Sequence, residues 1–206
     1  MPQSRRYKKK KSAGKTILAW IIVLAILAAG VFVFVSVFYE DAKKKLDEMN
    51  YPRTYSTYVE KAAKDYDLDP ALIYAVIHTE SGFDPKAESG VGAKGVMQMM
   101  PSSFEWLQEQ RGCAGQYTED DLFDPEICID YGSYLLKYFY DYYGMERSAI
   151  AAYNAGFVVS DWLNDTNYSS DGKNLDSIPY PETKNYVDKV ESAKEMYIKL
   201  YYSQSN

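Results

Sequence analysis

The hydrophobic and polar positions divide the chain into an uncharged N-terminal stretch and a long remainder in which the two kinds alternate. Residues 16–39 carry no charged side chain, whereas residues 1–15 hold seven Lys or Arg and no acid. As a helix, the uncharged stretch is about 35 Å long, enough to cross a hydrocarbon core of about 30 Å. The pattern therefore predicts one transmembrane helix over residues 16–39, preceded by a basic tail at residues 1–15.

A cleaved secretory signal peptide is the competing interpretation of this N-terminus. The apolar region of such a peptide spans only about 7–15 residues and ends at a small-residue cleavage site. The LAAG sequence at 27–30 offers such a site, but apolar residues continue beyond it, which favours an uncleaved signal anchor. Because the basic cluster comes first, the positive-inside rule predicts a cytoplasmic N-terminus. We expect a single-pass protein of the cell membrane with everything after residue 40 outside.

Beyond the apolar stretch, apolar residues recur at helical spacing nearly everywhere. Residues 40–54 form a charged, predicted stalk or linker, and residues 55–206 are predicted to form the folded domain. Helical periodicity and capping residues indicate helices over 55–68, 69–81, 101–110, 124–144, 148–156 and 181–202. No segment has the convincing two-residue period of a strand, although a small hairpin near residues 88–97 stays open. The fold class that we expect is all-α, with six or seven helices.

The charge balance excludes one class of partner. The basic tail takes seven of the 23 basic residues, so residues 40–206 keep 16 basic and 29 acidic side chains and a net charge of −13. A domain of this charge repels phosphates, and we expect no binding to nucleic acid.

Two cysteines, Cys113 and Cys128, lie in the exported part of the chain. In an oxidising compartment they are candidates for a disulfide, which would contribute roughly 3 kcal/mol on the chain-entropy model. The alternative is two small, partly buried thiols. Neither cysteine has a neighbour at the spacing that a zinc site needs, so no metal site is predicted.

The most informative polar residue is Glu80, at the end of the predicted helix 69–81. It follows Val76 by four residues and Ile77 by three, so its carboxyl projects from the apolar face. Desolvation there raises the pKa of a carboxyl group, which suits a general acid near neutral pH. The alternative is an ordinary glutamate that reaches solvent or pairs with a lysine. The one histidine, His78, lies on a different face, and we expect it to be packed or exposed rather than catalytic.

The segment SGVGAKGVMQMMP, residues 89–101, combines flexible backbone with one amide side chain. Its three glycines permit a tight path close to a ligand. Gln98 offers the donor and the acceptor that an N-acetyl group or a sugar hydroxyl requires. A structural turn followed by a methionine-rich core is the alternative. Further along, Tyr153 and Asn154 end a short helix, and Glu182 lies in the first turn of the last one, where the helix dipole favours its ionised form.

Four motifs in this order resemble those of the soluble lytic transglycosylase family, whose catalytic domain has a lysozyme-like fold of the goose type. They are ESGFDP at 80–85, SGVGAKGVMQ at 89–98, AYNAG at 152–156 and PETKNYV at 181–187. The departure within them is mild, since Val96 replaces a leucine. The resemblance covers about residues 55–200 and implies a role for each matching position. Glu80 aligns with the single catalytic acid/base. The residues implied for the glycan groove are Ser89, Gln98, Met100, Tyr153 and Glu182, with Asn154 and Tyr186 as neighbours.

The resemblance also implies a reaction on peptidoglycan glycan strands. Most glycosidases use two carboxyl groups, whereas this family needs one. Glu80 would protonate the glycosidic oxygen between N-acetylmuramic acid and N-acetylglucosamine. It would then take the proton of the muramyl 6-hydroxyl, which closes on the anomeric carbon as a 1,6-anhydro ring. Water is not consumed, and neither a metal nor an organic cofactor is required.

Two other functions stay open at this point. One is a hydrolytic muramidase on the same fold, in which Glu182 or a carboxylate of the Asp-rich loops positions a water molecule. The other is a non-catalytic, membrane-tethered scaffold that binds peptidoglycan. The intact Glu80 speaks against the second, because a protein without activity would be free to lose it.

Overall fold

The computed structural model describes residues 13–203, and their side chains from Ile17 onward. The chain forms two compact units that divide between Met49 and Asn50. The predicted basic tail falls almost wholly outside the described residues. The domain boundaries predicted from the sequence stay predictions.

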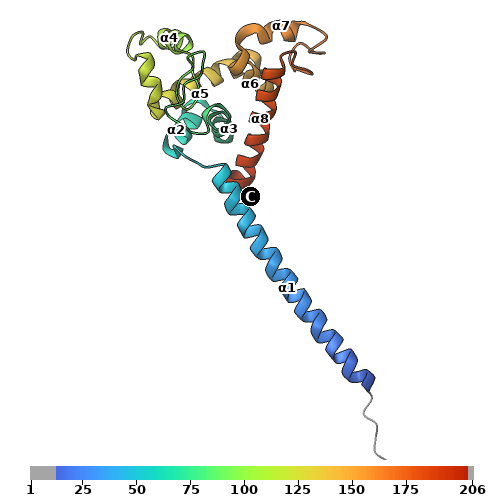
Figure 1. Ribbon diagram of the computed structural model, residues 1–206. Helices are drawn as coiled ribbons and strands as arrows, with labels where there is room; N and C mark the ends of the chain where they lie inside the picture. The colour runs from blue at the N-terminus through green and yellow to red at the C-terminus, as the bar shows by residue number, and fades with distance from the viewer. Residues whose placement is uncertain (1–12, 204–206) are drawn as a thin grey trace, which may run out of the picture. The chain divides into compact units, whose positions relative to one another are not determined.

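The first unit is one helix, α1 (Ala13–Asn50; Figure 1). From Ile17 it is long and apolar enough to cross a membrane, by length and composition. The helix runs without a break through the predicted span and most of the predicted stalk. In the charged part Lys45 pairs with Asp41, one helical turn away, with 2.9 Å between Nζ and Oδ2. The boundary at residue 39 is therefore a change of side-chain chemistry and not of backbone.

The second unit is all-α, as predicted, and no strand occurs in the described part of the chain. The predicted hairpin region holds two isolated bridges, Glu88 with Lys94 and Lys94 with Met99. The helices are α2 (Ser56–Tyr66), α3 (Pro70–Ser81), α4 (Pro101–Gln110), η1 (Glu119–Phe123), α5 (Pro125–Tyr143), α6 (Glu146–Ala155), η2 (Gly156–Val158), α7 (Val159–Asn164), α8 (Pro181–Tyr197) and η3 (Ile198–Tyr202). Helix α7 was not predicted, because six residues are too few to show a helical period.

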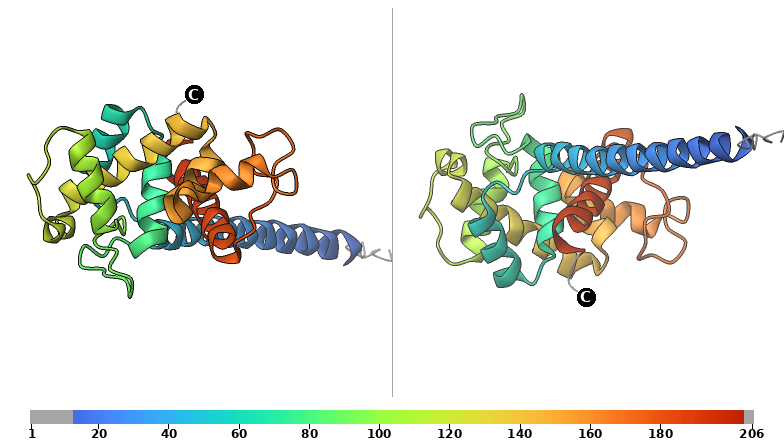
Figure 2. Two further views of the ribbon diagram at one scale, coloured as in Figure 1. Left: turned by 90° about the horizontal axis from the view of Figure 1, so that it is seen from above. Right: turned by 90° about the horizontal axis from the view of Figure 1, so that it is seen from below.

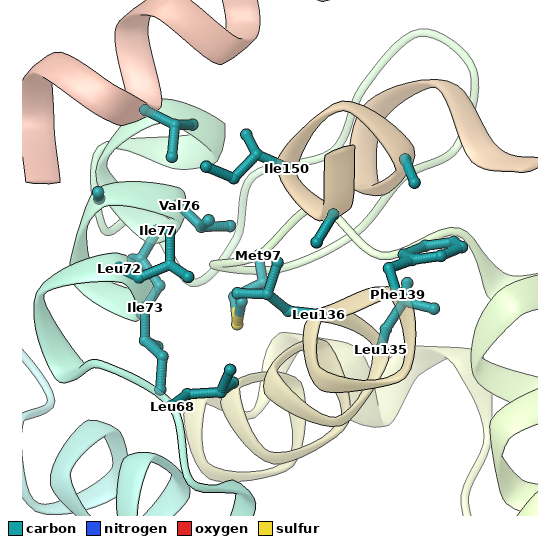
Figure 3. Packing of buried hydrophobic residues seen from close by; sticks show 14 of the residues in the cluster. Leu68, Leu72, Ile73, Val76, Ile77, Met97, Leu135, Leu136, Phe139 and Ile150 are labelled. Atoms are coloured by element: carbon teal, nitrogen blue, oxygen red, sulfur yellow. The ribbon is translucent and has the colours of Figure 1, made fainter. Parts of the chain in front are cut away.

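Helix α3 is the central element of the second unit. We expected one apolar stripe on it, but seven consecutive residues, Ala71–Ile77, are buried. A helix that is apolar on all sides belongs in the middle of a fold, and α3 packs against both α2 and α8. In Figure 3 the side chains of Met97 and Leu136 fill the space between the α3 residues and Phe139 of α5. The last turn of α3, which carries Glu80, is thereby held by neighbours on several sides.

Two peripheral segments complete the unit. The chain after α1 is tied down, since the Tyr197 hydroxyl donates to the Pro52 carbonyl (3.1 Å) and the Tyr201 hydroxyl to the Tyr51 carbonyl (2.8 Å). Part of the predicted stalk therefore packs on the folded unit. The loop between α7 and α8, residues 165–180, projects from the helices in both views of Figure 2.

Candidate active site

Local sequence fixes the position of Glu80 at the end of α3. Asp69 caps the start of the helix by accepting a hydrogen bond from the Ala71 N–H (2.9 Å), and Pro70 fits the first turn. The helix ends at Gly82, whose left-handed backbone (φ 59°) lets its N–H bond to the His78 carbonyl. Glu80 is partly buried in this last turn.

The surroundings of the Glu80 carboxyl are uncharged. Burial raises its pKa from 4.5 to about 7, and the Tyr186 hydroxyl, which offers its proton to the carboxylate, opposes the rise. No lysine or arginine of the described residues forms an ion pair with Glu80, and the groups that set its pKa include no second carboxylate. At neutral pH this carboxyl can both give and take a proton.

Two tyrosines lie beside this carboxyl, as the mutual effects on their pKa values indicate. Burial raises the pKa of both Tyr153 and Tyr186 well above 10, and the charge of Glu80 adds to each rise. The Tyr153 hydroxyl donates to the Met97 carbonyl (3.0 Å), which joins α6 to the loop after α3. The buried Tyr186 hydroxyl has the Glu80 carboxylate as its neighbour, and among the described residues no other group accepts or donates a hydrogen bond to it. Tyr186 is therefore tied to the Glu80 carboxyl.

The loop between α3 and α4 is held by its own polar side chains. Ser81 Oγ donates to the Val96 carbonyl (2.8 Å). The Gln98 amide nitrogen donates to the carbonyls of Ala87 and Gly95, both at 3.0 Å. Gln98 was predicted to offer a donor and an acceptor to a sugar. The structure commits the donors to the loop and leaves the amide oxygen as the acceptor.

Ser89 lies in the interior of the same loop, and Met100 is its last residue. Ser89 Oγ accepts from the Ala93 N–H (2.9 Å), so the side chain closes a turn. Met100 is 38% exposed immediately before α4. The glycine argument needs a correction at Gly95, where φ is +75° and a Cβ would overlap the Leu122 carbonyl. This glycine is required by packing inside the protein rather than by the approach of a ligand.

Asn154 and Glu182 lie at the meeting point of α6 and α8. The buried Thr183 donates its hydroxyl proton to Asn154 Oδ1 (2.7 Å), which fastens the end of α6 to the first turn of α8. Glu182, next to Thr183, is exposed. Sequence reasoning missed Thr183 and Ser81. Both are small hydroxyl residues. Their location inside the recognised motifs was the one feature of the sequence that could have identified them.

The two candidate disulfide partners, Cys113 and Cys128, are both free thiols in the structure. Cys128 is buried with its sulfur 3.4 Å from the Met97 N–H nitrogen, and burial raises the pKa of its thiol to about 12. Cys113 contacts the Tyr131 hydroxyl instead (3.3 Å). The arrangement is that of the alternative, two separate thiols, of which Cys128 is fully buried and Cys113 partly buried.

Other polar groups have structural positions. His78 is half-buried and its ring lies 4.8 Å from that of Tyr51, while burial lowers the pKa of its imidazole. In the Asp-rich loop, Asp171 accepts from two backbone N–H groups, and Asp176 accepts from the Ser170 N–H. Within residues 13–203 no group of three His, Cys, Asp or Glu side chains could hold a metal ion.

Comparisons with known proteins bear on the same unit. Residues 57–175 match the transglycosylase SLT domain family. Over 146 residues the chain is 32% identical to the soluble lytic murein transglycosylase of Escherichia coli K12, which covers 69% of this chain and 23% of that protein. It is 31% identical over 167 residues to the membrane-bound lytic murein transglycosylase C of Actinobacillus succinogenes, which covers 70% of this chain and 47% of that protein.

A solved structure extends the likeness to three dimensions. The X-ray structure of an inactive glutamate-to-glutamine mutant of a lytic transglycosylase from Pseudomonas aeruginosa superposes with a TM-score of 0.65 at 30% identity. The likeness covers 74% of this chain and 25% of that one. The chain thus spans about a quarter of the soluble relative and about half of the membrane-bound one. The lysozyme-like, all-α fold is confirmed.

Proposed function

Since this chain belongs to the transglycosylase SLT domain family, we propose that its folded unit is a peptidoglycan lytic transglycosylase in which Glu80 is the one catalytic acid/base. The observation that carries the proposal is the state of the Glu80 carboxyl. It is desolvated to a pKa of about 7 and faces tyrosine hydroxyls, with no ion-pair partner among the described residues. The inactive mutant of the relative from Pseudomonas aeruginosa carries a glutamate-to-glutamine change. This agrees with a mechanism that depends on one glutamate.

The proposed reaction uses Glu80 twice. In its protonated form it gives its proton to the oxygen of the bond between N-acetylmuramic acid and N-acetylglucosamine, and that bond breaks. The resulting carboxylate takes the proton of the muramyl 6-hydroxyl, whose oxygen bonds to the anomeric carbon. Glu80 ends protonated, as it began, and no water is consumed. A pKa near 7 suits both steps.

The remaining predicted residues would hold the glycan. Tyr186 would orient the Glu80 carboxyl through its hydroxyl, and the Gln98 amide oxygen would accept from an N–H or O–H of a sugar, since the Gln98 nitrogen donates within the loop. Tyr153 would keep the α3–α4 loop in place through Met97. Ser89, Met100, Asn154 and Glu182 complete the proposed groove. Of these, Ser89 and Asn154 also serve internal bonds.

We further infer that α1 anchors this unit in the cell membrane with the N-terminus inside. The apolar helix and the membrane-bound relative support this placement. We expect the full-length protein to leave membranes only in detergent. We also expect a protease added from the outside to digest its second unit. Release by salt alone would contradict it.

The decisive experiment is digestion of purified peptidoglycan by the full chain in detergent, followed by mass spectrometry of the muropeptide ends. We expect 1,6-anhydro ends, lighter by one water than hydrolysed ends. Reducing ends would instead establish a hydrolase, with Glu182 as the first candidate for the second carboxylate. Binding without cleavage would favour a scaffold.

A further inference from the structure

An aromatic surface outside the proposed groove has no role in the reaction. On α5, Tyr134, Tyr138 and Tyr142 recur every four residues, so they lie along one face of the helix. Tyr142 is 58% exposed, and Phe157 of η2 is 49% exposed. A contiguous group of large exposed rings is unusual on a protein surface that has no binding partner.

Ring contacts join Tyr138, Tyr142 and Phe157 to one another and to a ring of α4, across three elements. The Tyr138 ring lies 5.0 Å from that of Trp106 in α4 and 6.2 Å from that of Phe157, both edge-on. The Phe157 ring also lies 5.7 Å from that of Tyr142. We call Trp106, Tyr134, Tyr138, Tyr142 and Phe157 the aromatic patch.

The patch includes a depression with a polar rim. A pocket of about 340 Å³ is lined by the three tyrosines together with Lys137 and Asp141. Lys137 and Asp141 form an ion pair at 2.5 Å. Apolar and aromatic walls with a few placed polar groups are typical of small-ligand sites, whose volumes begin at about 300 Å³.

The chain connects the patch to the proposed groove by two short routes. Phe157 follows Tyr153 by four residues, which bounds their separation at about 14 Å along the backbone. Trp106 follows Met100 by six residues, and the helix between them rises about 9 Å. These chain spacings put two members of the patch within about 9–14 Å of groove residues, a distance that several sugar units of one strand span.

We propose that the aromatic patch is a further glycan-binding subsite, remote from the cleaved bond, on which a sugar ring of a long strand stacks. This inference rests on the proposed function. A sugar ring offers an apolar C–H face to an aromatic ring, while its hydroxyls meet the charged groups of Lys137 and Asp141. Tyrosine suits such a contact, because its ring is apolar and its hydroxyl is wet. Continuity with the groove favours glycan over a protein partner.

The test compares Tyr142→Ala with Tyr140→Ala in the full chain, each combined with Glu80→Gln to stop cleavage. Tyr140 is a matched control, since it is a 37% exposed tyrosine on the same helix and outside the patch. Calorimetry would measure the affinity for peptide-free strands of two and of eight alternating N-acetylglucosamine and N-acetylmuramic acid units. We expect Tyr142→Ala to weaken only the long strand, by about three- to tenfold. Tyr142→Trp should restore its affinity, and Tyr140→Ala should change neither.

The outcomes separate the subsite from the function on which it rests. If Tyr142→Ala binds the long strand as tightly as the protein that keeps Tyr142, the subsite is overturned and the function is left intact. The same result is expected if the patch binds another protein. An equal loss for both strands would overturn the subsite too. If the wild-type chain neither binds nor cleaves any glycan, the proposed function fails first. Unchanged thermal unfolding of Tyr142→Ala shows that any loss is local.

Discussion

Two partly buried carboxylates of the second unit, Glu80 and Asp130, have opposite surroundings. Asp130 accepts from Arg111 Nη1 at 2.6 Å and from the Tyr66 hydroxyl at 2.5 Å. Glu80 has no cationic partner in the described part of the chain, and its pKa is raised to about 7. The protein satisfies one carboxylate completely and leaves the other with its proton to exchange. An unpaired, desolvated acid is the arrangement that catalysis needs and that stability does not.

The cluster around Asp130 is built as a structural tie. The Arg111 guanidinium lies 4.3 Å from the centre of the Tyr131 ring and 4.4 Å from that of Tyr134, and it also bonds to the Tyr66 hydroxyl. It therefore joins the end of α4 to α2 and α5. Cation–π contacts of this kind are worth about 0.5–2 kcal/mol each.

The largest expected effect separates the two carboxylates by activity. Glu80→Gln removes the exchangeable proton with little change of shape, and the rate of muropeptide release should fall by about 10³-fold, within the range typical of acid/base catalysis. Glycan binding should persist. Asp130→Asn is the matched control, and its rate should stay within about twofold of the wild type, because Asp130 does not touch the site. Normal cleavage by Glu80→Gln would remove Glu80 from the mechanism.

The same pair also marks what the sequence could and could not predict. Glu80 follows from a local helical pattern and from a motif, both contained in a few consecutive residues. The Arg111 cluster joins residues 19 and 45 positions apart, and no local period carries that information. Helix α3 was predicted with its bounds nearly correct. The burial of α3 on every side was not predicted, because it depends on the tertiary packing of α2 and α8 against this helix.

The two cysteines and Gly95 show the same limit of the sequence. Two cysteines 15 positions apart invite pairing, but their side chains enter different packing environments, one beneath Met97 and one beside Tyr131. The three glycines of residues 89–101 left a ligand contact and a structural turn both open, and the neighbour that demands Gly95 is Leu122, from a distant segment. Composition gives the residue type that a position needs, but only the fold gives its neighbour.

The second expected effect concerns stability against pH. The pKa of Glu80 is about 7 in the folded chain against an ordinary value of 4.5. Between these two pH values the folded state binds more protons than the unfolded state, so this group makes stability fall as pH rises. The full difference is about 3 kcal/mol. We expect Glu80→Gln to match the wild type near pH 4 and to exceed it by about this amount above pH 8.

Urea unfolding at a series of pH values measures this difference directly. The gap between the two proteins should open through the interval from about pH 4.5 to pH 7 and then stay constant. A gap that is the same at every pH would mean that Glu80 is not desolvated in the folded chain. The comparison with Asp130 would then lose its basis.

The smallest expected effect removes the cation from the other carboxylate. Arg111→Met keeps the length of the side chain but leaves Asp130, 32% exposed, without its charged partner. Fully buried pairs lose about 3–5 kcal/mol when one partner is removed, and exposed ones less than about 1. We expect an intermediate loss of about 2 kcal/mol in urea unfolding, with the cleavage rate unchanged below the unfolding transition. Lys61→Met, which breaks the exposed pair with Asp65 (2.6 Å), is the control and should cost less than about 0.5 kcal/mol.

A second substitution at Asp130 decides how that loss arises. If it comes from a carboxylate left unpaired, replacing Asp130 by Leu in the Arg111→Met protein removes the unpaired charge and should recover about half of the lost stability. If it comes instead from the lost contacts of Arg111 with the Tyr131 and Tyr134 rings, the second change recovers nothing. Recovery would mean that Asp130, deprived of its cation, destabilises the fold as an unpaired carboxylate, as Glu80 does in the native fold. The cation that the protein supplies to Asp130 and withholds from Glu80 would then account for the difference in sign between the two.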